Sequence, residues 1–311
     1  MMQPHEAQHA ATETAREGFN AGETIIGHVA NSSVDHPLIH LPKIYGIDFS
    51  VTKHVFMIWL VAAVLFVVVT WIVRRYLKHE QERPVPTGSM NALEAVVEFV
   101  RDSISQPNVG SKWVLTWTPL FLTFFFFILG ANLIGLIPIF DVLNLLNHTV
   151  LHSPHDSFFS KMLEGGVTAT GNFNVTAALA TITFFTIIIA GARAHGFVKH
   201  WKNMVPHGLP LPVTLFLIPI EIMGMLVRPF ALTMRLAANM TGGHIAILAI
   251  LSFVFIFTQQ FGPAAGMGVG VFSLTLAALI SALEIIVVLV QAYVFTLLSA
   301  VFIGMAIHAH H

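Results

Sequence analysis

Five long apolar runs dominate the chain, near residues 55–73, 117–140, 174–192, 213–257 and 267–307. A helix needs about 20 apolar residues to cross the roughly 30 Å hydrocarbon core of a bilayer. Each run is about that long or longer. We therefore predict an all-α, polytopic membrane protein with about five transmembrane helices.

The last two runs are longer than one perpendicular crossing requires. At 1.5 Å per residue, helices over 213–257 and 267–307 measure roughly 60 to 70 Å each, about twice the hydrocarbon thickness. Either each run breaks into two spans, or each forms one steeply inclined, bent helix. Pro219 and Pro229 permit bends in the first. The turn Gln-Gln-Phe-Gly-Pro-Ala-Ala-Gly, at 259–266, separates the two runs.

A shorter amphipathic segment, about 91–104, lies between the first two runs. Apolar residues recur in it at helical spacing, and Asn91 and Glu94 are placed as a capping pair at its start. We interpret it as a surface helix that lies on lipid headgroups or on a partner, rather than as a site. Its polar face carries Glu94, Glu98, Arg101 and Asp102.

The basic residues predict how the chain crosses the membrane, because cytoplasmic loops retain Lys and Arg. Residues 74–112 hold six of them, whereas residues 141–171 hold only Lys161. The next polar break, around 193–202, is basic again. The amino terminus is thus expected outside and the carboxyl terminus in the cytoplasm. We divide the chain into an external polar tail, 1–47, and a single membrane domain, 48–311.

Composition excludes several classes of function. Of the 311 residues, 55% are hydrophobic and 10% are charged, and the 15 basic and 16 acidic residues give no field that attracts nucleic acid. Cysteine is absent, which excludes disulfides and thiolate chemistry. The sequence shows no phosphate-binding glycine loop, nucleophile elbow or HExxH helix. We expect no catalytic site and no cofactor in this chain, and we interpret its terminal histidines as solvated rather than metal-binding.

Residues 203–311 contain only four formal charges: Glu221, Arg228, Arg235 and Glu284. An ionised side chain at mid-membrane costs about 2.5 to 3.5 kcal/mol on the lenient insertion scale, so such residues normally face a protein interior or a water-filled cavity. The first three are spaced seven apart and, with Asn239, form one helical stripe. This stripe is either a structural ion-pair seam or part of an ion path. Arg235 favours the path, because the stripe offers it no carboxylate of its own.

A second polar group accompanies this stripe. Glu284 and Gln291 are seven apart on the final run, and His244 lies nine residues beyond Arg235. If the two long helices form a hairpin, His244 and Glu284 can approach each other across it. A histidine and a carboxylate together form a plausible proton relay, whereas His244 alone is as readily a helix-packing histidine.

Specific motifs resemble one protein family. The segment 226–244, LVRPFALTMRLAANMTGGH, resembles the signature helix of subunit a of the rotary F-type ATP synthase. The segment 283–298, LEIIVVLVQAYVFTLL, is similar to its terminal helix. The motif Gly171-Asn-Phe-Asn-Val-Thr176 resembles the family's Asp-Val-Asn-Val-Thr element, with Asn172 in place of the acid and Asn174 matching. The resemblance extends from about Asp48 to the end of the chain.

The resemblance implies a stator that lines two aqueous half-channels against a rotating ring of c subunits. Arg235 falls on the family's essential arginine, which lowers the pKa of each passing ring carboxylate and blocks direct proton leakage. The family relation places Asn239, His244, Glu284 and Gln291 in the outer half-channel. Glu221 and Arg228 lie on the earlier part of the stripe, toward the inner opening. Many bacterial members of the family look as if they carry the two residue types exchanged, with an acid where His244 stands and a histidine where Glu284 stands. This exchange suggests that the two residues act jointly.

Further expectations follow from this resemblance. The partners implied are the c-subunit ring, the peripheral-stalk b subunits, the remaining ATP synthase subunits and the lipid bilayer, in the energy-transducing inner membrane of a bacterium. A steeply inclined hairpin suits the curved face of a ring, so we prefer it to two extra spans. Selectivity between H⁺ and Na⁺ depends on the ring carboxylate, which belongs to another chain. Two alternatives stay open: an ion-coupled secondary transporter with a polar site in the last two helices, and a scaffold without an ion path.

Overall fold

The computed structural model describes most of the predicted membrane domain. The external tail and the loop at 141–171 lie largely outside the described part, and so do the histidines at both ends apart from His308. The described residues are 21–22, 25–26, 37–39, 41–42, 48, 50–78, 85–136, 168–202 and 210–308.

Five helices are long and apolar enough to cross a membrane, which confirms the predicted all-α class. Within the described ranges the only β-type pairing is an isolated bridge between Ile39 and Val51. Four of these helices cover their predicted runs, and the second covers its run as far as Leu136, where the description stops. The five helices are α3 (Lys53–Leu77), α6 (Val114–Leu136), α9 (Phe173–His195), α11 (Leu211–Phe261) and α12 (Pro263–Ile307).

The two last helices are unbroken, so each run forms the single long helix that we preferred to two extra spans. Helix α11 continues for 51 residues through Pro219 and Pro229, and α12 for 45 residues. The predicted eight-residue turn is wrong in length, because only Gly262 lies between the helices. Its φ of 89° is a left-handed conformation that glycine adopts without strain. Pro263 then starts α12, a position where its missing N–H is not needed.

The predicted surface helix is present but starts earlier and changes its winding. It consists of α4 (Ser89–Glu98), a π-helical segment η1 (Phe99–Ser105) and α5 (Gln106–Val109). The capping prediction is wrong, since the N-cap is Gly88 and no side chain caps the helix. Asn91 therefore falls inside the first turn rather than ahead of it.

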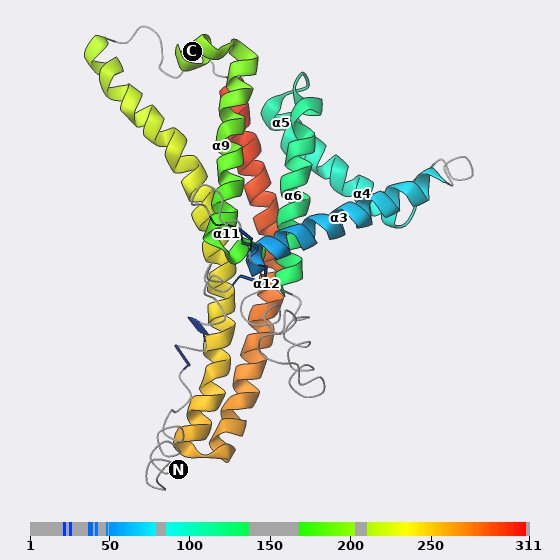
Figure 1. Cartoon of the computed structure of the whole chain (residues 1–311), viewed down its shortest axis with the longest axis vertical. Coiled ribbons are helices and arrows are strands. Elements are labelled where there is room, and N and C mark those ends of the chain that lie inside the picture. Colours follow the sequence, from blue (N-terminus) through cyan, green and yellow to red (C-terminus); the bar gives the residue numbers. More distant parts are fainter. Residues whose placement is uncertain are drawn as a thin grey trace. The chain divides into compact units, whose positions relative to one another are not determined.

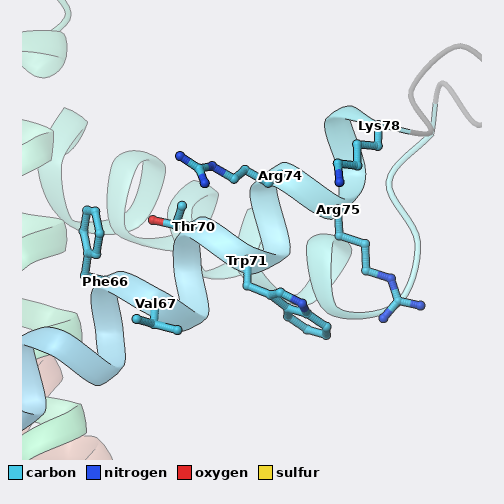
Figure 2. A pocket seen from close by; sticks show the side chains of 7 residues that line it. All are labelled: Phe66, Val67, Thr70, Trp71, Arg74, Arg75 and Lys78. Carbon is cyan, nitrogen blue, oxygen red and sulfur yellow. The ribbon is translucent and has the colours of Figure 1, made fainter.

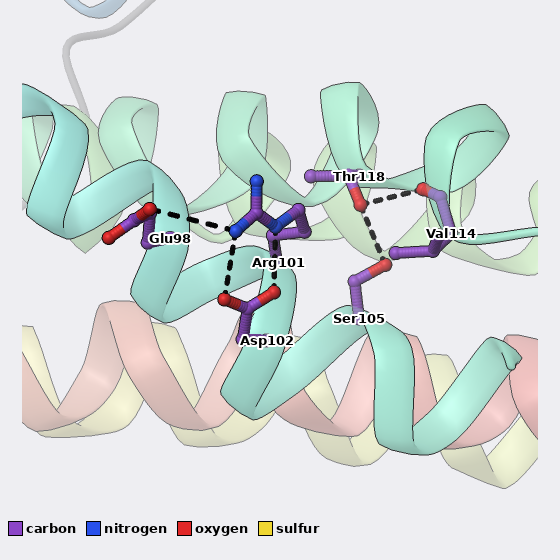
Figure 3. Close-up of polar contacts among 6 residues, drawn as sticks. All are labelled: Glu98, Arg101, Asp102, Ser105, Val114 and Thr118. Carbon is purple, nitrogen blue, oxygen red and sulfur yellow. Dashed lines mark hydrogen bonds and ion pairs between the residues drawn. The ribbon is translucent and has the colours of Figure 1, made fainter. Parts of the chain in front are cut away.

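The η1 segment is attached to α6 and neutralises its own charges (Figure 3). The Thr118 hydroxyl hydrogen-bonds Ser105 Oγ at 2.8 Å on the buried side. On the exposed side Arg101 donates two hydrogen bonds to Asp102, at 2.6 and 2.9 Å. The hydrogen bond from this guanidinium holds the pKa of the Asp102 carboxyl below its usual value. The charges on this helix are thus largely satisfied locally, in line with a surface role.

The chain forms two compact units, which we describe separately. The larger unit contains α3, α6, α9, the first part of α11 up to Met240 and the last part of α12 from Val287. Its core is aromatic at the centre, where the rings of Phe124 and Phe295 pack edge to face with centroids 5.5 Å apart. Other members of this core include Ile104, Phe121, Ile128, Ile187, Leu232, Leu236 and Ile303.

The smaller unit includes Thr241–Ile286, the end of α11 and the start of α12. The two segments run side by side as an antiparallel hairpin (Figure 1, yellow and orange). Glycines allow close approach near the turn: a Cβ on Gly266 would lie 1.8 Å from Thr258 Oγ1, and one on Gly270 would contact Val254. The predicted hairpin is therefore confirmed. The inclination of its helices to a bilayer stays a prediction.

Candidate functional site

Arg235 occupies the exposed face of α11 in the larger unit. On an adjoining face of the same helix, Leu232 and Leu236 are buried in the core at 2% and 0% exposure. The core contacts therefore fix the rotation of α11 and turn Arg235 outward. No carboxylate of the described residues lies within ion-pair distance of its guanidinium.

One helical turn beyond Arg235, Asn239 joins the two long helices through an amide pair. Asn239 Nδ2 donates a 2.9 Å hydrogen bond to Gln291 Oε1 on α12. Gln291 is only 4% exposed and precedes Ala292, which belongs to the core. Its buried carbonyl thus has the hydrogen-bond donor that a buried polar group requires. The sequence predicted both residues as site members, and the structure brings them into contact.

His244 and Glu284 meet across the hairpin of the smaller unit. His244 Nδ1 lies 3.3 Å from Glu284 Oε1, with side-chain exposures of 29% and 5%. The predicted approach of the two side chains is thus confirmed. Glu284 Oε1 is fully buried and accepts no well-aligned hydrogen bond from any residue that the structure describes. This contact therefore joins a nearly buried carboxylate to a histidine that solvent can reach.

Glu221 and Arg228 do not form the structural seam that was one alternative for the stripe. Neither has an ion pair among the described residues. The Arg228 guanidinium instead stacks 5.6 Å from the ring centroid of Phe302 on α12, a cation–π contact that needs no acid. Both side chains are partly exposed, so each remains reachable by water or by a partner.

Asn172 and Asn174 stand at the beginning of α9. Asn172 is the N-cap, and its Oδ1 accepts a 2.8 Å hydrogen bond from the backbone N–H of Asn174. Aspartate and asparagine cap helices about equally well. The replacement of the acid that the resemblance noted therefore preserves this local structure.

Comparison with known proteins shows to which family the chain belongs. A family model described as ATP synthase A chain matches residues 55–304. The chain belongs to this family. Similar curated proteins include ATP synthase subunit a 2 of Prosthecochloris aestuarii, 38% identical over 97% of this chain and 85% of its own. Subunit a of Pelodictyon phaeoclathratiforme is 37% identical over 96% of this chain and 80% of its own. Subunit a of Chloroherpeton thalassium is 38% identical over 88% of this chain and 72% of its own.

The structure adds one residue, Gly243, to which the sequence analysis assigned no role. A Cβ placed on Gly243 would lie 2.3 Å from Glu284 Oε1 and 2.9 Å from its Cδ. The carboxylate therefore reaches His244 only because residue 243 has no side chain. The signal was visible as the Gly-Gly pair before His244, but spacing alone does not tell which glycine faces the other helix.

A buried polar cluster between α6 and the short 3₁₀ helix η3 (Ala169–Gly171), which precedes α9, was also missed. Asn132 is fully buried, and the Thr170 hydroxyl donates a hydrogen bond to its Oδ1. Thr168 packs so closely on Gly135 that a Cβ there would overlap its hydroxyl. These residues lie near the Asn172 cap. The cluster was not predictable from the sequence, because it depends on how the two helices pack.

Proposed function

We propose that this chain is the proton-translocating stator subunit of an F-type ATP synthase. It lines two aqueous half-channels against a rotating ring of c subunits. Arg235 controls the ionisation of each passing ring carboxylate and prevents protons from crossing directly between the half-channels. The single observation that carries the proposal is a guanidinium on the exposed face of α11 with no carboxylate of the described chain beside it.

The physical reason is the permanent charge of arginine. A guanidinium stays protonated at any physiological pH, so it favours the ionised form of a carboxylate that comes close. A ring carboxylate therefore releases its proton on approach and takes up another after leaving. A carboxylate fixed within this chain would compete for the same charge, and none of the described acids occupies that place.

The outer half-channel uses the two contacts between the long helices. Glu284, with one buried carboxylate oxygen that accepts no hydrogen bond within the described chain, can take a proton from His244 or return it. Asn239 and Gln291 are hydrogen-bonded to each other. On α11, Asn239 lies between His244 and Arg235, and on α12 Gln291 lies seven residues beyond Glu284. Glu221 and Arg228 serve the inner opening. Asn172 and Asn174 contribute indirectly, through the capped start of α9 that they form.

The proposal includes partners and orientation. The curated relatives are named as subunits of ATP synthase, so this chain assembles with the c ring, the peripheral-stalk b subunits and the remaining subunits. It lies in the energy-transducing inner membrane of a bacterium, with residues 1–47 outside, residues 48–311 as one membrane domain and the carboxyl terminus in the cytoplasm. The unbroken hairpin helices are inclined to the membrane normal and follow the curve of the ring.

The substitution Arg235→Ala tests the proposal in the assembled complex reconstituted into vesicles. We expect ATP-driven proton pumping to be lost while the complex still assembles. We also expect passive proton leakage through the membrane sector to increase, because the barrier between the half-channels is removed. Subunit composition after purification verifies assembly.

Arg193→Ala provides the matched control. It removes the same side chain from an exposed position at the end of α9, away from the polar stripe. Its pumping is expected to equal that of the unmodified complex. Unchanged pumping in the Arg235→Ala complex would exclude the stator role.

A further inference from the structure

The last turns of α3 carry a groove that the proposed ion path does not use. The groove has a volume of about 570 Å³ and lies on the part of α3 that points away from α6 (Figure 1). The described residues that line it are six of α3 and its C-cap, Lys78: Phe66, Val67, Thr70, Trp71, Arg74, Arg75 and Lys78 (Figure 2).

The groove is apolar at one end and cationic at the other. Phe66 and Val67 are 73% and 62% exposed, and Figure 2 shows their side chains toward the middle of the helix. Arg74 and Lys78 stand four residues apart on the last turns, both exposed. At 1.5 Å per residue the groove extends about 18 Å from Phe66 to Lys78, which spans the boundary between hydrocarbon and headgroups.

Trp71 marks that boundary. Its ring lies between the apolar and the cationic ends, and Arg75 stacks on it at 5.3 Å from the centroid. Tryptophan is enriched at membrane interfaces, where its ring is apolar and its N–H reaches water. The indole thus places the charged end of the groove at the level of lipid phosphates.

Two of the cations at this level lack a counter-charge among the described residues. Neither Arg74 nor Lys78 has an ion pair with a carboxylate of the described chain. Only 11% of the most apolar window of α3 is buried, so the helix surface below them is left for lipid. An exposed apolar face that ends in these two cations is complementary to an amphiphile with an anionic head.

We propose that this groove binds an anionic phospholipid of the cytoplasmic leaflet. The phosphodiester lies between Arg74 and Lys78, and an acyl chain lies along Phe66 and Val67. Basic residues just beyond a transmembrane helix attract anionic lipids, each by about 1 kcal/mol, which is roughly fivefold in binding. The site lies outside the ion path and does not depend on the role of Arg235, while its assignment to the cytoplasmic leaflet rests on the proposed orientation of the chain.

Trp71 makes the site measurable in the full-length chain. The chain is reconstituted into phosphatidylcholine vesicles that contain rising fractions of brominated phosphatidylglycerol, whose bromine atoms quench nearby tryptophans. The signal of Trp71 is the difference between the unmodified chain and Trp71→Phe. We expect quenching to saturate at a lower fraction of brominated phosphatidylglycerol than of brominated phosphatidylcholine. The double substitution Arg74→Gln and Lys78→Gln should reduce this preference by roughly 25-fold.

Lys112→Gln is the matched control. Lys112 also stands near a tryptophan, with its Nζ 5.4 Å from the Trp113 centroid, but it does not line the groove. This substitution should leave the Trp71 signal unchanged.

Three outcomes would overturn the proposal. The first is equal quenching of Trp71 by the two brominated lipids. The second is loss of the preference on adding glycerol phosphate, which would assign the cations to a soluble anion. The third is protection of Trp71 from both lipids in the whole ATP synthase complex, which would show that a protein partner covers this face. Proton pumping by the double variant should be normal in every case, so the result is separate from the test of Arg235.

Discussion

The contact between Gly243 and Glu284 yields a sharp prediction about the polar pair in the hairpin. In Gly243→Ala the added methyl group would lie 2.3 Å from Glu284 Oε1, whereas ordinary van der Waals contacts begin at 3.4 Å. The carboxylate must therefore move by about 1 Å. Because His244 approaches the same oxygen at 3.3 Å, this movement separates the pair.

The structure allows the size of the effect to be worked out. A displacement of about 1 Å can by itself slow a positioned reaction on the order of a hundredfold. We therefore expect proton pumping to fall by about 10- to 100-fold. The fold should not be weakened, since alanine is favoured over glycine within a helix by about 1 kcal/mol.

The adjacent glycine offers a matched control. A Cβ on Gly242 meets nothing within 4 Å, so Gly242→Ala gains the same helix propensity without touching Glu284. ATP-driven pumping in vesicles and thermal unfolding are measured for both variants. A second substitution, Glu284→Asp, shortens the acid and should partly restore pumping when combined with Gly243→Ala. Equal pumping by the Gly242→Ala and Gly243→Ala complexes would refute the reasoning.

Three further predictions concern stability rather than transport. Asn172→Ala should lower stability by about 1 kcal/mol through loss of the N-cap of α9, whereas Asn172→Asp should not, as thermal unfolding will show. Gly304→Ala should lower the Tm because its Cβ would lie 2.2 Å from the carbonyl oxygen of Asn108, while Gly268→Ala, with open space, should not. Burial, and to a smaller extent the charge of nearby His195, hold the pKa of His200 below 6.5. The folded state therefore binds fewer protons than the unfolded state, so stability is lost as the pH falls below about 6.5, and His200→Gln should remove this loss in unfolding measurements.

Most of the fold could be predicted from hydrophobicity alone. The five helices follow from apolar runs of sufficient length, because lipid leaves helices as the only simple way to satisfy the backbone. The predictions that were wrong concern local details. The hairpin turn is shorter than its composition suggested, since Pro263 begins a helix as readily as it ends one. The surface helix starts at Ser89 because Gly88 provides the N-cap.

The site was predictable where helical spacing and rare charges coincide. Spacing of seven placed Glu284 and Gln291 on one face of α12, and the structure gives each a partner on α11. Spacing did not predict that Arg228 turns to Phe302, because the choice between an acid and an aromatic ring depends on how α12 is rotated. It also gave no sign of the buried cluster at Asn132, because this cluster depends on how η3 packs against α6.

Arg235 lies on a helix face that the described chain leaves uncovered. Its exposed neighbours on α11 are apolar, among them Phe230 at 58% and Met234 at 44%. The arginine is 24 residues from the first residue of α11, roughly 36 Å along the axis, so its side chain cannot reach the water beyond that end. Lipid against this face would leave the guanidinium in hydrocarbon at a cost of about 2.5 to 3.5 kcal/mol. A protein surface that presents a carboxylate at the same depth removes this cost, and if its carboxylates arrive in turn, the same contact drives each proton transfer.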